Sequence, residues 1–361
     1  MANESDLGAV RERIDATDEQ LLALISERAR LATEIAELKR DGDPDVVFYR
    51  PEREAQVLRE IIKKNKGPLS NEEMARLFRE IMSACLALEQ QLEVAFLGPE
   101  GTFTQSAVLK HFGHSVKTKA QSSIAEVFRE VESGACNYGI VPVENSIEGA
   151  INHTLDRLIT SSLKICGEVH LRIHQNLMSK AEQLQSIKRV YSHQQSLAQC
   201  RSWLDNNLAN VERIAVSSNA EAAMCALENE QSAAIAGEVA AQYYQLPILA
   251  TNIEDEPDNT TRFLVLGQNT GKPSGKDKTS ILFANANEPG ALQKTLACFA
   301  DNNINMSRIE SRPSRQGIWE YVFFADIDGH VDDEIIVKVL QQLKQHALMM
   351  KVLGSYPCAV L

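Results

Sequence analysis

No glycine or proline interrupts residues 9–41, and this stretch constrains the fold more than any other. Its apolar residues recur every three or four positions, the spacing of one face of an α-helix. They are Val10, Ile14, Leu21, Leu24, Ile25, Leu31, Ile35 and Leu38. The pattern predicts a helix from about Leu7 to Arg40, about 50 Å long at 1.5 Å per residue. A small domain does not need so long a helix, so we expect a partner helix from another subunit.

Two shorter helices are expected after the long one. The first runs from Pro51, which suits an opening helical turn, to about Asn65. Ser70 can cap the next helix, which reaches about Gln91. Three helices of such unequal length cannot enclose a core alone. Residues 1–92 therefore predict an all-α domain that intertwines with a second copy, in a homodimer or a higher homo-oligomer.

Basic residues on the long helix indicate a site for an anion. Arg28 and Lys39 are eleven residues apart and so lie on nearly the same helical face. Arg11 is seventeen residues from Arg28 and points off that face. If all three serve one pocket, Arg11 enters from the other subunit. Solvated surface charge explains these spacings equally well on their own.

The overall charge argues against nucleic acid as the main partner. The chain has a net charge of −12 and a pI near 5.3, whereas a phosphate backbone needs a basic face. No apolar run is long enough to cross a membrane, and the polar N-terminus lacks the apolar core of a signal peptide. The seven scattered cysteines form no paired motif, which disfavours a disulfide framework and a zinc site. A cytoplasmic location is expected.

Residues 93–267 alternate between short apolar segments and helical segments, which predicts an α/β fold. Strands are expected at Glu93–Leu97, Tyr138–Val143, Arg189–Tyr191, Ile214–Ser217, Ala233–Ala236 and Phe263–Leu266. The helices between them include Ser123–Glu132, Gln195–Asn206 and Ala220–Glu228. Polar clusters follow several of these strands, at the carboxyl ends where α/β folds bind their ligands.

One of these clusters lies in the stretch Gly139–Ala150. We expect its strand to stop by Glu144 and a helix to start at Asn145 or Ser146, with Glu148 completing the cap. The N–H groups at such a helix start attract a carboxylate. An ordinary strand–turn–helix joint is the alternative.

The last part of the chain predicts a third domain. Residues 268–277 have the composition of a linker. After it we expect strand Thr279–Ala284, helix Ala291–Asp301, strands Asn305–Ser311 and Glu320–Asp326, helix Glu334–Gln345 and strand Lys351–Ser355. This βαββαβ order over 278–361 predicts an α+β, ferredoxin-like unit. A structural or dimerising appendage is also compatible with so common a fold.

Several residues of the helical segment carry a resemblance to a known family. Ala9–Ile14, the positions of Arg28 and Lys39, Arg53-Glu54 after Pro51, and Cys85 with Glu89 resemble the all-helical chorismate mutase domain. The resemblance implies that Arg11, Arg28 and Lys39 hold the two carboxylates and the ether oxygen of chorismate. It places Arg50, Arg53, Glu54 and Cys85 around the substrate, with Glu54 contacting the substrate hydroxyl. Arg50 and Cys85 stand where the family has Asp and Ser.

A pericyclic rearrangement needs no nucleophile, only a held conformer and donors at the breaking ether bond. Lys39 and Glu89 are therefore the expected catalytic groups. Glu89 can donate a hydrogen bond only while protonated, so its pKa is expected to be raised.

The middle segment resembles prephenate dehydratase through the motifs G-P-x-G-T-F, V-P-x-E-N-S-x-x-G and T-R-F. That family has two α/β lobes like a periplasmic binding protein, with the site in the cleft. The resemblance implies that Thr261 is catalytic and assists the leaving hydroxide. The substrate would contact Thr102, Phe103, Thr104, Ser122, Glu144, Asn145, Ser146, Arg262 and Phe263. Backbone N–H groups at residues 145–147 would bind its carboxylates.

His193 and its neighbour Ser192 are open to more than one interpretation. A serine beside a histidine suggests a hydrolase, but residues that are adjacent in the sequence rarely belong to one catalytic triad. A capping or structural role for His193 is as compatible with the sequence as a catalytic one. Gln194, which follows, stands where the family usually has Pro.

The loop Glu288-Pro289-Gly290-Ala291-Leu292 and the strand end Glu310-Ser311-Arg312-Pro313 resemble the ACT regulatory domain of phenylalanine-sensitive dehydratases. The expected phenylalanine site comprises Pro289, Gly290, Ala291 and Leu292 with Glu310, Ser311, Arg312 and Pro313. The resemblance implies that phenylalanine binds between two such domains and favours a closed, inactive state.

Together the three resemblances imply a bifunctional enzyme of phenylalanine biosynthesis that takes chorismate, prephenate and phenylalanine as its ligands. No metal or organic cofactor is implied. The alternative is a cytosolic amino-acid sensor with a degenerate helical dimeriser. The retained Arg11, Arg28, Lys39 and Thr261 argue against that alternative.

Overall fold

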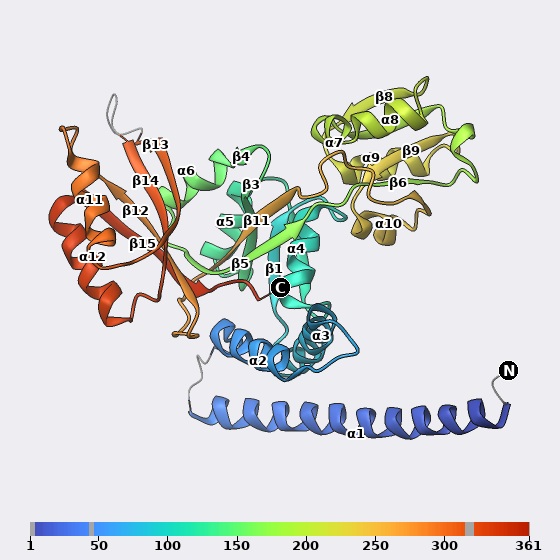
Figure 1. Cartoon of the computed structure of the whole chain (residues 1–361), viewed down its shortest axis with the longest axis horizontal. Helices are drawn as coiled ribbons and strands as arrows, with labels where there is room; N and C mark the ends of the chain where they lie inside the picture. Colours follow the sequence, from blue (N-terminus) through green and yellow to red (C-terminus); the bar gives the residue numbers. More distant parts are fainter. Residues whose placement is uncertain (1–3, 43–46, 315–320, 361) are drawn as a thin grey trace.

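A computed structural model describes residues 4–42, 47–314 and 321–360. Helices α1–α3 form one layer at one side of a two-lobed α/β body, and a smaller sheet with two helices lies at the far end of that body (Figure 1). None of the described helices combines the length and apolar character that crossing a bilayer requires.

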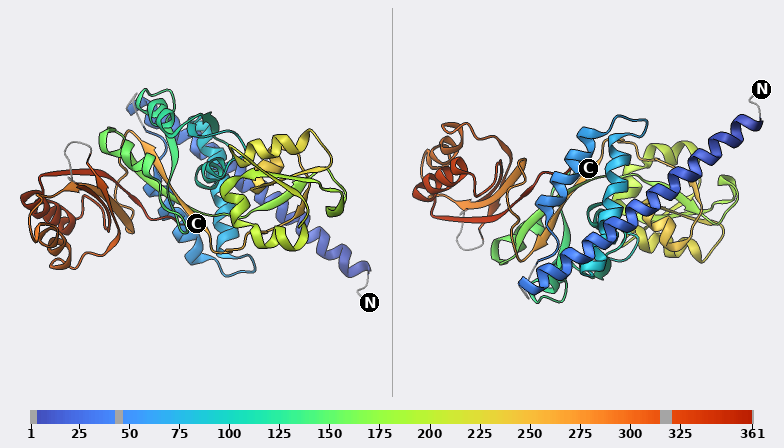
Figure 2. Two further views of the ribbon diagram at one scale, coloured as in Figure 1. Left: turned by 90° about the horizontal axis from the view of Figure 1, so that it is seen from above. Right: turned by 90° about the horizontal axis from the view of Figure 1, so that it is seen from below.

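The first three helices are α1 (Glu4–Gly42), α2 (Pro51–Lys64) and α3 (Asn71–Glu89), which confirms the predicted helices. Ser70 caps α3, since its hydroxyl accepts the N–H of Glu73 at 3.1 Å. Helix α1 packs on α3 through its C-terminal half, and its N-terminal half projects past the rest of the chain (Figures 1 and 2).

The apolar positions of α1 that carried the helix prediction are exposed in the single chain. Val10, Ile14, Leu21, Leu24, Ile25, Leu31, Ile35 and Leu38 are all among the exposed large apolar side chains. A face of this length is too apolar for a solvated surface, because burial is worth about 25 cal/mol per Å² of apolar area.

The first lobe is built on a sheet with the strand order β2-β1-β3-β11-β5, in which β4 also pairs with β3. The strands are β1 (Glu93–Leu97), β2 (Lys117–Gln121), β3 (Tyr138–Asn145), β4 (Gly149–Ala150), β5 (Lys164–Arg172) and β11 (Thr260–Gly267). Strand β1 is parallel to both of its neighbours, and β11 is antiparallel to β3 and β5. Helices α4 (Phe103–Phe112), α5 (Ile124–Glu132) and α6 (Asn152–Thr160) complete this lobe.

The second lobe has the strand order β10-β6-β9-β7-β8. These strands are β6 (Asn176–Ser179), β7 (Arg189–His193), β8 (Glu212–Val216), β9 (Ser232–Ala236) and β10 (Ile248–Ala250). The helices are η1 (Leu184–Ser186), α7 (Gln194–Gln199), α8 (Arg201–Asn207), α9 (Asn219–Leu227) and α10 (Glu238–Tyr244). The expected helix 195–206 is divided, since the buried Cys200 leaves the helical conformation at φ −112° and ψ 18°.

The expected helix start at residue 145 or 146 is wrong. Strand β3 continues to Asn145, and the side-chain oxygen of Asn145 accepts the N–H groups of Ile147 and Glu148. This turn sends the chain back as β4, and α6 starts only at Asn152. The amide side chain of Asn145 thus satisfies N–H groups that a helix start would have left free.

The C-terminal domain confirms the βαββαβ order. Its elements are β12 (Asp277–Ala284), α11 (Ala291–Ala300), β13 (Met306–Pro313), β14 (Tyr321–Asp328), α12 (Glu334–His346) and β15 (Met349–Pro357). The expected strand start at Glu320 lies outside the described residues. The sheet order is β13-β14-β12-β15.

One face of this sheet packs on its helices and the other on the first lobe. Phe283 and Ile327 share a core with the helices, whereas Leu282, Phe324 and Leu353 share one with Val141 of β3. Strand β15 passes so close to β5 that a Cβ on Gly354 would collide with the carbonyl oxygen of Ile165.

Helix α4 joins the helical layer to the first lobe. Arg79 of α3 donates a hydrogen bond to the carbonyl of Lys110 at 2.7 Å. The Tyr49 hydroxyl and His111 Nε2 are 3.0 Å apart in a partly buried contact, and desolvation lowers the pKa of His111 to about 3. The imidazole is therefore neutral in this contact at neutral pH.

Candidate active sites

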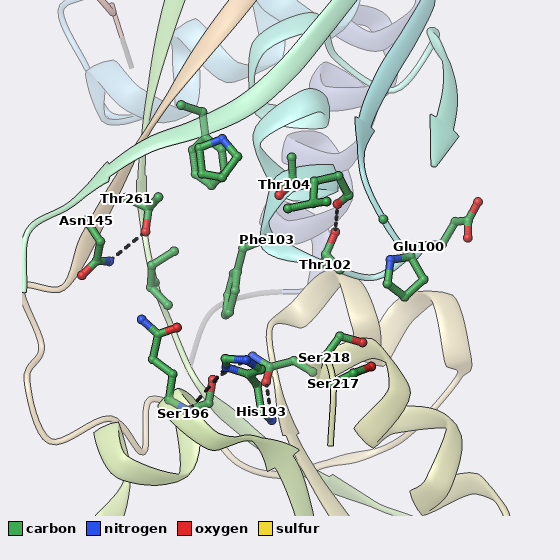
Figure 3. A pocket seen from close by; sticks show the side chains of 18 of the residues that line it. Glu100, Thr102, Phe103, Thr104, Asn145, His193, Ser196, Ser217, Ser218 and Thr261 are labelled. Atoms are coloured by element: carbon green, nitrogen blue, oxygen red, sulfur yellow. Dashed lines mark hydrogen bonds between the residues drawn. The ribbon is translucent and has the colours of Figure 1, made fainter. Parts of the chain in front are cut away.

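A cavity of about 730 Å³ separates the two lobes, and we call it the cleft. The first lobe contributes Thr102, Phe103, Thr104, Ser122, Asn145, Thr261 and Phe263 to its lining. The second lobe and the connecting segments contribute Gln175, His193, Ser196, Ser217, Ser218, Asn219 and Asn259. In Figure 3, Thr261 and Asn145 lie to one side of Phe103 and Thr102 and Thr104 to the other, and the second-lobe residues His193, Ser196, Ser217 and Ser218 lie below them.

The hydrogen bonds of Asn145 fix the orientation of Thr261. Because Asn145 Oδ1 accepts two backbone N–H groups, its Nδ2 must be the donor to its other neighbours. Nδ2 donates to Thr261 Oγ1 at 2.9 Å and to Asn259 Oδ1 at 2.8 Å. The Thr261 oxygen is therefore an acceptor towards Asn145, and its own proton is left available for a further acceptor.

Two other hydroxyls expected at the anion site donate within the protein. Thr102 Oγ1 donates to the carbonyl of Leu97 at 3.1 Å, and Ser122 Oγ donates to Glu126 at 2.6 Å. Both line the cleft, but in this arrangement their protons are not offered to a ligand.

The structure corrects three expected members of the cleft. Arg262 and Glu144 alternate with the cleft-facing Thr261 and Asn145, so they point to the opposite face of the sheet. Ser146 is hydrogen-bonded to β11. Its hydroxyl accepts the N–H of Thr260 at 2.9 Å, and its own N–H donates to the Thr260 carbonyl. The backbone N–H groups of Ser146 and Ile147, two of the three expected to bind the carboxylates, are thus bonded within the protein.

His193 lines the cleft and caps α7, with its Nδ1 accepting the N–H of Gln195 at 3.4 Å. Ser192 is fully buried and donates to the carbonyl of Ile235 and to Asn219. Both side chains therefore have structural partners, which leaves the hydrolase interpretation without support.

One cleft residue, Gln175, had no signal in the sequence. Gln175 lies in the segment between β5 and β6, and its amide group donates to Ser196 at 3.0 Å. Asn219 also donates to Ser196, at 2.9 Å, and so ties α9 to α7. These residues come from three separate segments, and no motif in any of them indicates the others.

A second cavity, of about 360 Å³, lies between α1, α2 and α3. It is lined by the expected polar residues Arg28, Lys39, Arg50, Arg53, Glu54, Cys85 and Glu89, and by apolar residues that include Leu31, Ile35, Val57 and Leu86. Arg11 is not part of this lining, because it lies on the projecting half of α1. We call this cavity the helical pocket.

Positive charge exceeds negative charge in the helical pocket. Lys39 Nζ lies 3.8 Å from Glu89, and Arg50 lies 3.5 Å from Glu52. Burial raises the pKa of Glu89 above its usual range, although Lys39, Arg28 and Arg40 act to lower it. Burial also raises the pKa of Glu54, against the effect of Arg79, which donates to it at 3.2 Å.

The expected regulatory residues lie at two places in the C-terminal domain. Pro289, Gly290, Ala291 and Leu292 form the start of α11, where Gly290 adopts φ +80°. Arg312 and Glu310 lie on the face of β13 that looks towards the first lobe, and Arg312 donates to Asp156 of α6 at 2.9 Å. Ser311 and Pro313 lie on the exposed face of the same strand.

Comparison with known proteins assigns a family to each part of the chain. The family models described as chorismate mutase type II, prephenate dehydratase and ACT domain match residues 10–90, 94–271 and 279–345. The chain is 58% identical over 365 residues to a bifunctional chorismate mutase/prephenate dehydratase of Stutzerimonas stutzeri, and 57% identical to that of Pseudomonas aeruginosa. Both matches cover 100% of each chain.

Among solved structures, the chain is similar to the prephenate dehydratase of Arthrobacter aurescens in complex with L-Phe. The two are 34% identical with a TM-score of 0.68, and the match covers 74% of this chain and 90% of that one.

Proposed function

This chain belongs to the family of bifunctional chorismate mutase/prephenate dehydratases, and we propose that its two reactions take place in the helical pocket and the cleft. It converts chorismate to prephenate and prephenate to phenylpyruvate. The assignment of each reaction to a cavity rests on where the two family models match.

For the mutase reaction, Arg28 and Lys39 hold the carboxylates and the ether oxygen of chorismate, with Arg53 and Glu54 beside the ring. Their grouping in one pocket with apolar walls supports this role, since a dianion is held best by fixed cations in a site of low dielectric. Glu89 donates to the ether oxygen in its protonated form, which its raised pKa favours.

For the dehydratase reaction, Thr261 donates a hydrogen bond to the hydroxyl group that leaves prephenate. The observation that carries this proposal is the Asn145–Thr261 hydrogen bond, because it leaves the threonine proton free at the wall of the cleft. Threonine is too weak an acid for full proton donation, so it assists by hydrogen bonding as charge develops on the leaving oxygen. Loss of carbon dioxide and hydroxide then gives the aromatic ring.

Substitution of Thr261 tests the assignment. Thr261→Ala is expected to lower dehydratase kcat by about a hundredfold or more, as removal of an oriented donor does elsewhere. Thr261→Ser keeps the hydroxyl and is expected to keep most of the turnover. Mutase activity, measured on the same preparations with chorismate, should not change in either variant. Normal dehydratase turnover in Thr261→Ala would refute the role of Thr261.

Phenylalanine inhibits the dehydratase by binding to the C-terminal domain, between two copies of that domain, and by favouring a closed state. The match to an ACT domain and the similarity to the dehydratase solved with L-Phe support this part of the proposal. The residues that contact phenylalanine are those of the α11 start and of β13. Inhibition requires only that phenylalanine bind one state of the enzyme more tightly than the other.

The enzyme acts as a cytoplasmic homodimer or higher oligomer, in which α1 of one subunit lies along the helical layer of the next. The exposed apolar face of α1 supports this arrangement, as does the absence of Arg11 from the pocket of its own chain. The functional units are residues 1–92 for the mutase, 93–267 for the dehydratase, 268–277 for a linker and 278–361 for regulation.

A further inference from the structure

Two ion pairs connect the C-terminal domain to the strands that carry Thr261 and Asn145. In the antiparallel pair of β11 and β3, Thr261 lies opposite Asn145, and the next residues, Arg262 and Glu144, lie opposite each other. Because side chains alternate between the faces of a sheet, the first pair faces the cleft and the second pair faces the C-terminal domain. Arg262 thus directly follows Thr261, and Glu144 directly precedes Asn145. Both charged residues lie on the face of the sheet opposite the cleft.

The first of these connections is fully buried. The Arg262 guanidinium donates to Asp326 of β14 at 2.6 Å, to the Tyr356 hydroxyl of β15 at 3.0 Å and to Glu168 of β5 at 2.9 Å. The exposed fractions are 8% for Arg262 and 4% for Asp326. A guanidinium that is bonded in three directions has no second position of similar energy, so it fixes β11 relative to the C-terminal sheet.

The second connection is looser. Arg308 of β13 lies 3.1 Å from Glu144 of β3, and the Glu144 side chain is 39% exposed. Within the described residues, Nε and Nη2 of Arg308 have no hydrogen-bond partner. A charge pair without hydrogen bonds tolerates a shift of its strand better than the Arg262 contacts do.

We propose that Asp326 and Arg308 are positioning residues of the dehydratase reaction. They act through Arg262 and Glu144, and so hold the Thr261–Asn145 pair in register from behind the sheet. The same contacts carry the effect of phenylalanine to the cleft, since any movement of the C-terminal sheet must move or break them. This inference rests on the proposed role of Thr261.

The experiment compares Asp326→Asn and Arg308→Gln with a matched control. The control is Lys351→Met, because Lys351 also crosses the interface, donating to the carbonyls of Leu158, Ile159 and Ser161 at 3.0, 3.2 and 2.5 Å. Among the residues that the structure describes, it has no hydrogen bond or ion pair with β3 or β11. If the pairs act only by keeping the domains together, all three variants should behave alike.

For Asp326→Asn and Arg308→Gln we expect dehydratase kcat to fall about tenfold with KM nearly unchanged, because neither residue contacts substrate and small misplacements of catalytic groups are costly. Lys351→Met should retain the wild-type kcat. Mutase kcat in the same preparations should be unchanged throughout, which also verifies folding. The partly exposed Glu144–Arg308 pair keeps the test usable if Asp326→Asn does not fold.

A second readout concerns phenylalanine. Titration calorimetry should give an unchanged phenylalanine Kd in Arg308→Gln. Saturating phenylalanine, however, should remove a smaller fraction of the dehydratase activity of this variant than of the wild type. Unaltered kcat and full inhibition in both variants would overturn the inference, as would an equal loss in Lys351→Met. If Thr261→Ala also stayed active, the proposed function itself would be at fault; an inactive Thr261→Ala beside normal Asp326 and Arg308 variants would reject the positioning role alone.

Discussion

Asn145 sets the pattern of donors and acceptors at the cleft. Two backbone N–H groups fix its oxygen, its nitrogen therefore donates to Thr261, and the Thr261 proton is freed for a ligand. The sequence motif indicated that Asn145 belongs to the site, but as part of an anion-binding helix start. Instead, the Asn145 side chain accepts the N–H of Ile147, which is one of the groups that were expected to bind the anion.

Glu89 gives the first prediction at the residue scale. It donates to the ether oxygen only while protonated, so mutase kcat should be highest at low pH and should fall as pH rises through its raised pKa. Glu89→Gln donates at every pH, and its profile should be flat. The measurement is mutase kcat against pH for both proteins.

Glu54 is the alternative origin of such a profile, since burial raises its pKa as well. A decline with pH that persisted in Glu89→Gln and disappeared in Glu54→Gln would assign the titration to Glu54. The dehydratase profile of the same variants serves as the control, because neither residue lines the cleft.

Ser311 and Arg312 give the second prediction. Ser311→Ala or Arg312→Ala should raise the phenylalanine concentration needed for half-inhibition by roughly tenfold, as loss of a charged or polar contact does, while catalysis changes less. Dehydratase assays across a phenylalanine series measure both effects.

Asp156→Asn is the matched control for Arg312, since it alters the carboxylate that Arg312 bonds in α6. If Asp156→Asn desensitises the enzyme as much as Arg312→Ala, Arg312 acts through the domain contact and not through phenylalanine. If Ser311→Ala and Arg312→Ala kept the wild-type sensitivity to phenylalanine, the regulatory site would have to lie elsewhere.

At the scale of elements, periodic segments were predictable and irregular ones were not. Helices α1 and α3 and the C-terminal βαββαβ unit follow from spacing and capping residues, because those signals are local. Strands β2, β4, β5, β6 and β10 were missed. Strand β2 reads Lys-Thr-Lys-Ala-Gln and has little apolar character, since it lies at the edge of its sheet. The sequence also could not predict on which face of the sheet Arg262 lies, because that depends on which face of β11 meets the cleft.

The crossing of β15 over β5 gives a prediction at this scale. Gly354→Ala would place a methyl group against the Ile165 carbonyl, and overpacking of this kind costs about 1–3 kcal/mol. The thermal unfolding midpoint should fall by several degrees. In Gly8→Ala, where an added methyl meets no atom within 4 Å, the midpoint should not fall. An unchanged midpoint in Gly354→Ala would mean that the two strands separate more easily than their packing indicates.

At the scale of the whole molecule, the helical pocket is incomplete in one chain. Arg28 and Lys39 line it, and Arg11 does not. If the partner supplies Arg11, co-expressed Arg11→Ala and Lys39→Ala subunits should regain about a quarter of the wild-type mutase activity. Half of the dimers would be mixed, and one of their two sites would be intact.

Co-expression of Arg28→Ala with Lys39→Ala is the control, because both residues belong to the same pocket and no mixed site can be intact. Restored activity in the control, or none in the Arg11 and Lys39 mixture, would contradict a shared site. Purification through two different affinity tags isolates the mixed dimers, whose mutase activity should then be about half that of the wild type.

Helix α4 begins at the cleft with Phe103 and ends against the helical layer, where Lys110 receives Arg79 and His111 meets Tyr49. Separating the chain between α3 and β1 would expose Arg79 and Tyr49 on one fragment and His111 on the other, each without the partner that it has across this contact. Each fragment would need substitutions on its newly exposed surface before it could exist as a separate protein. The contact between the two catalytic domains therefore makes the fused chain easier to retain than to divide.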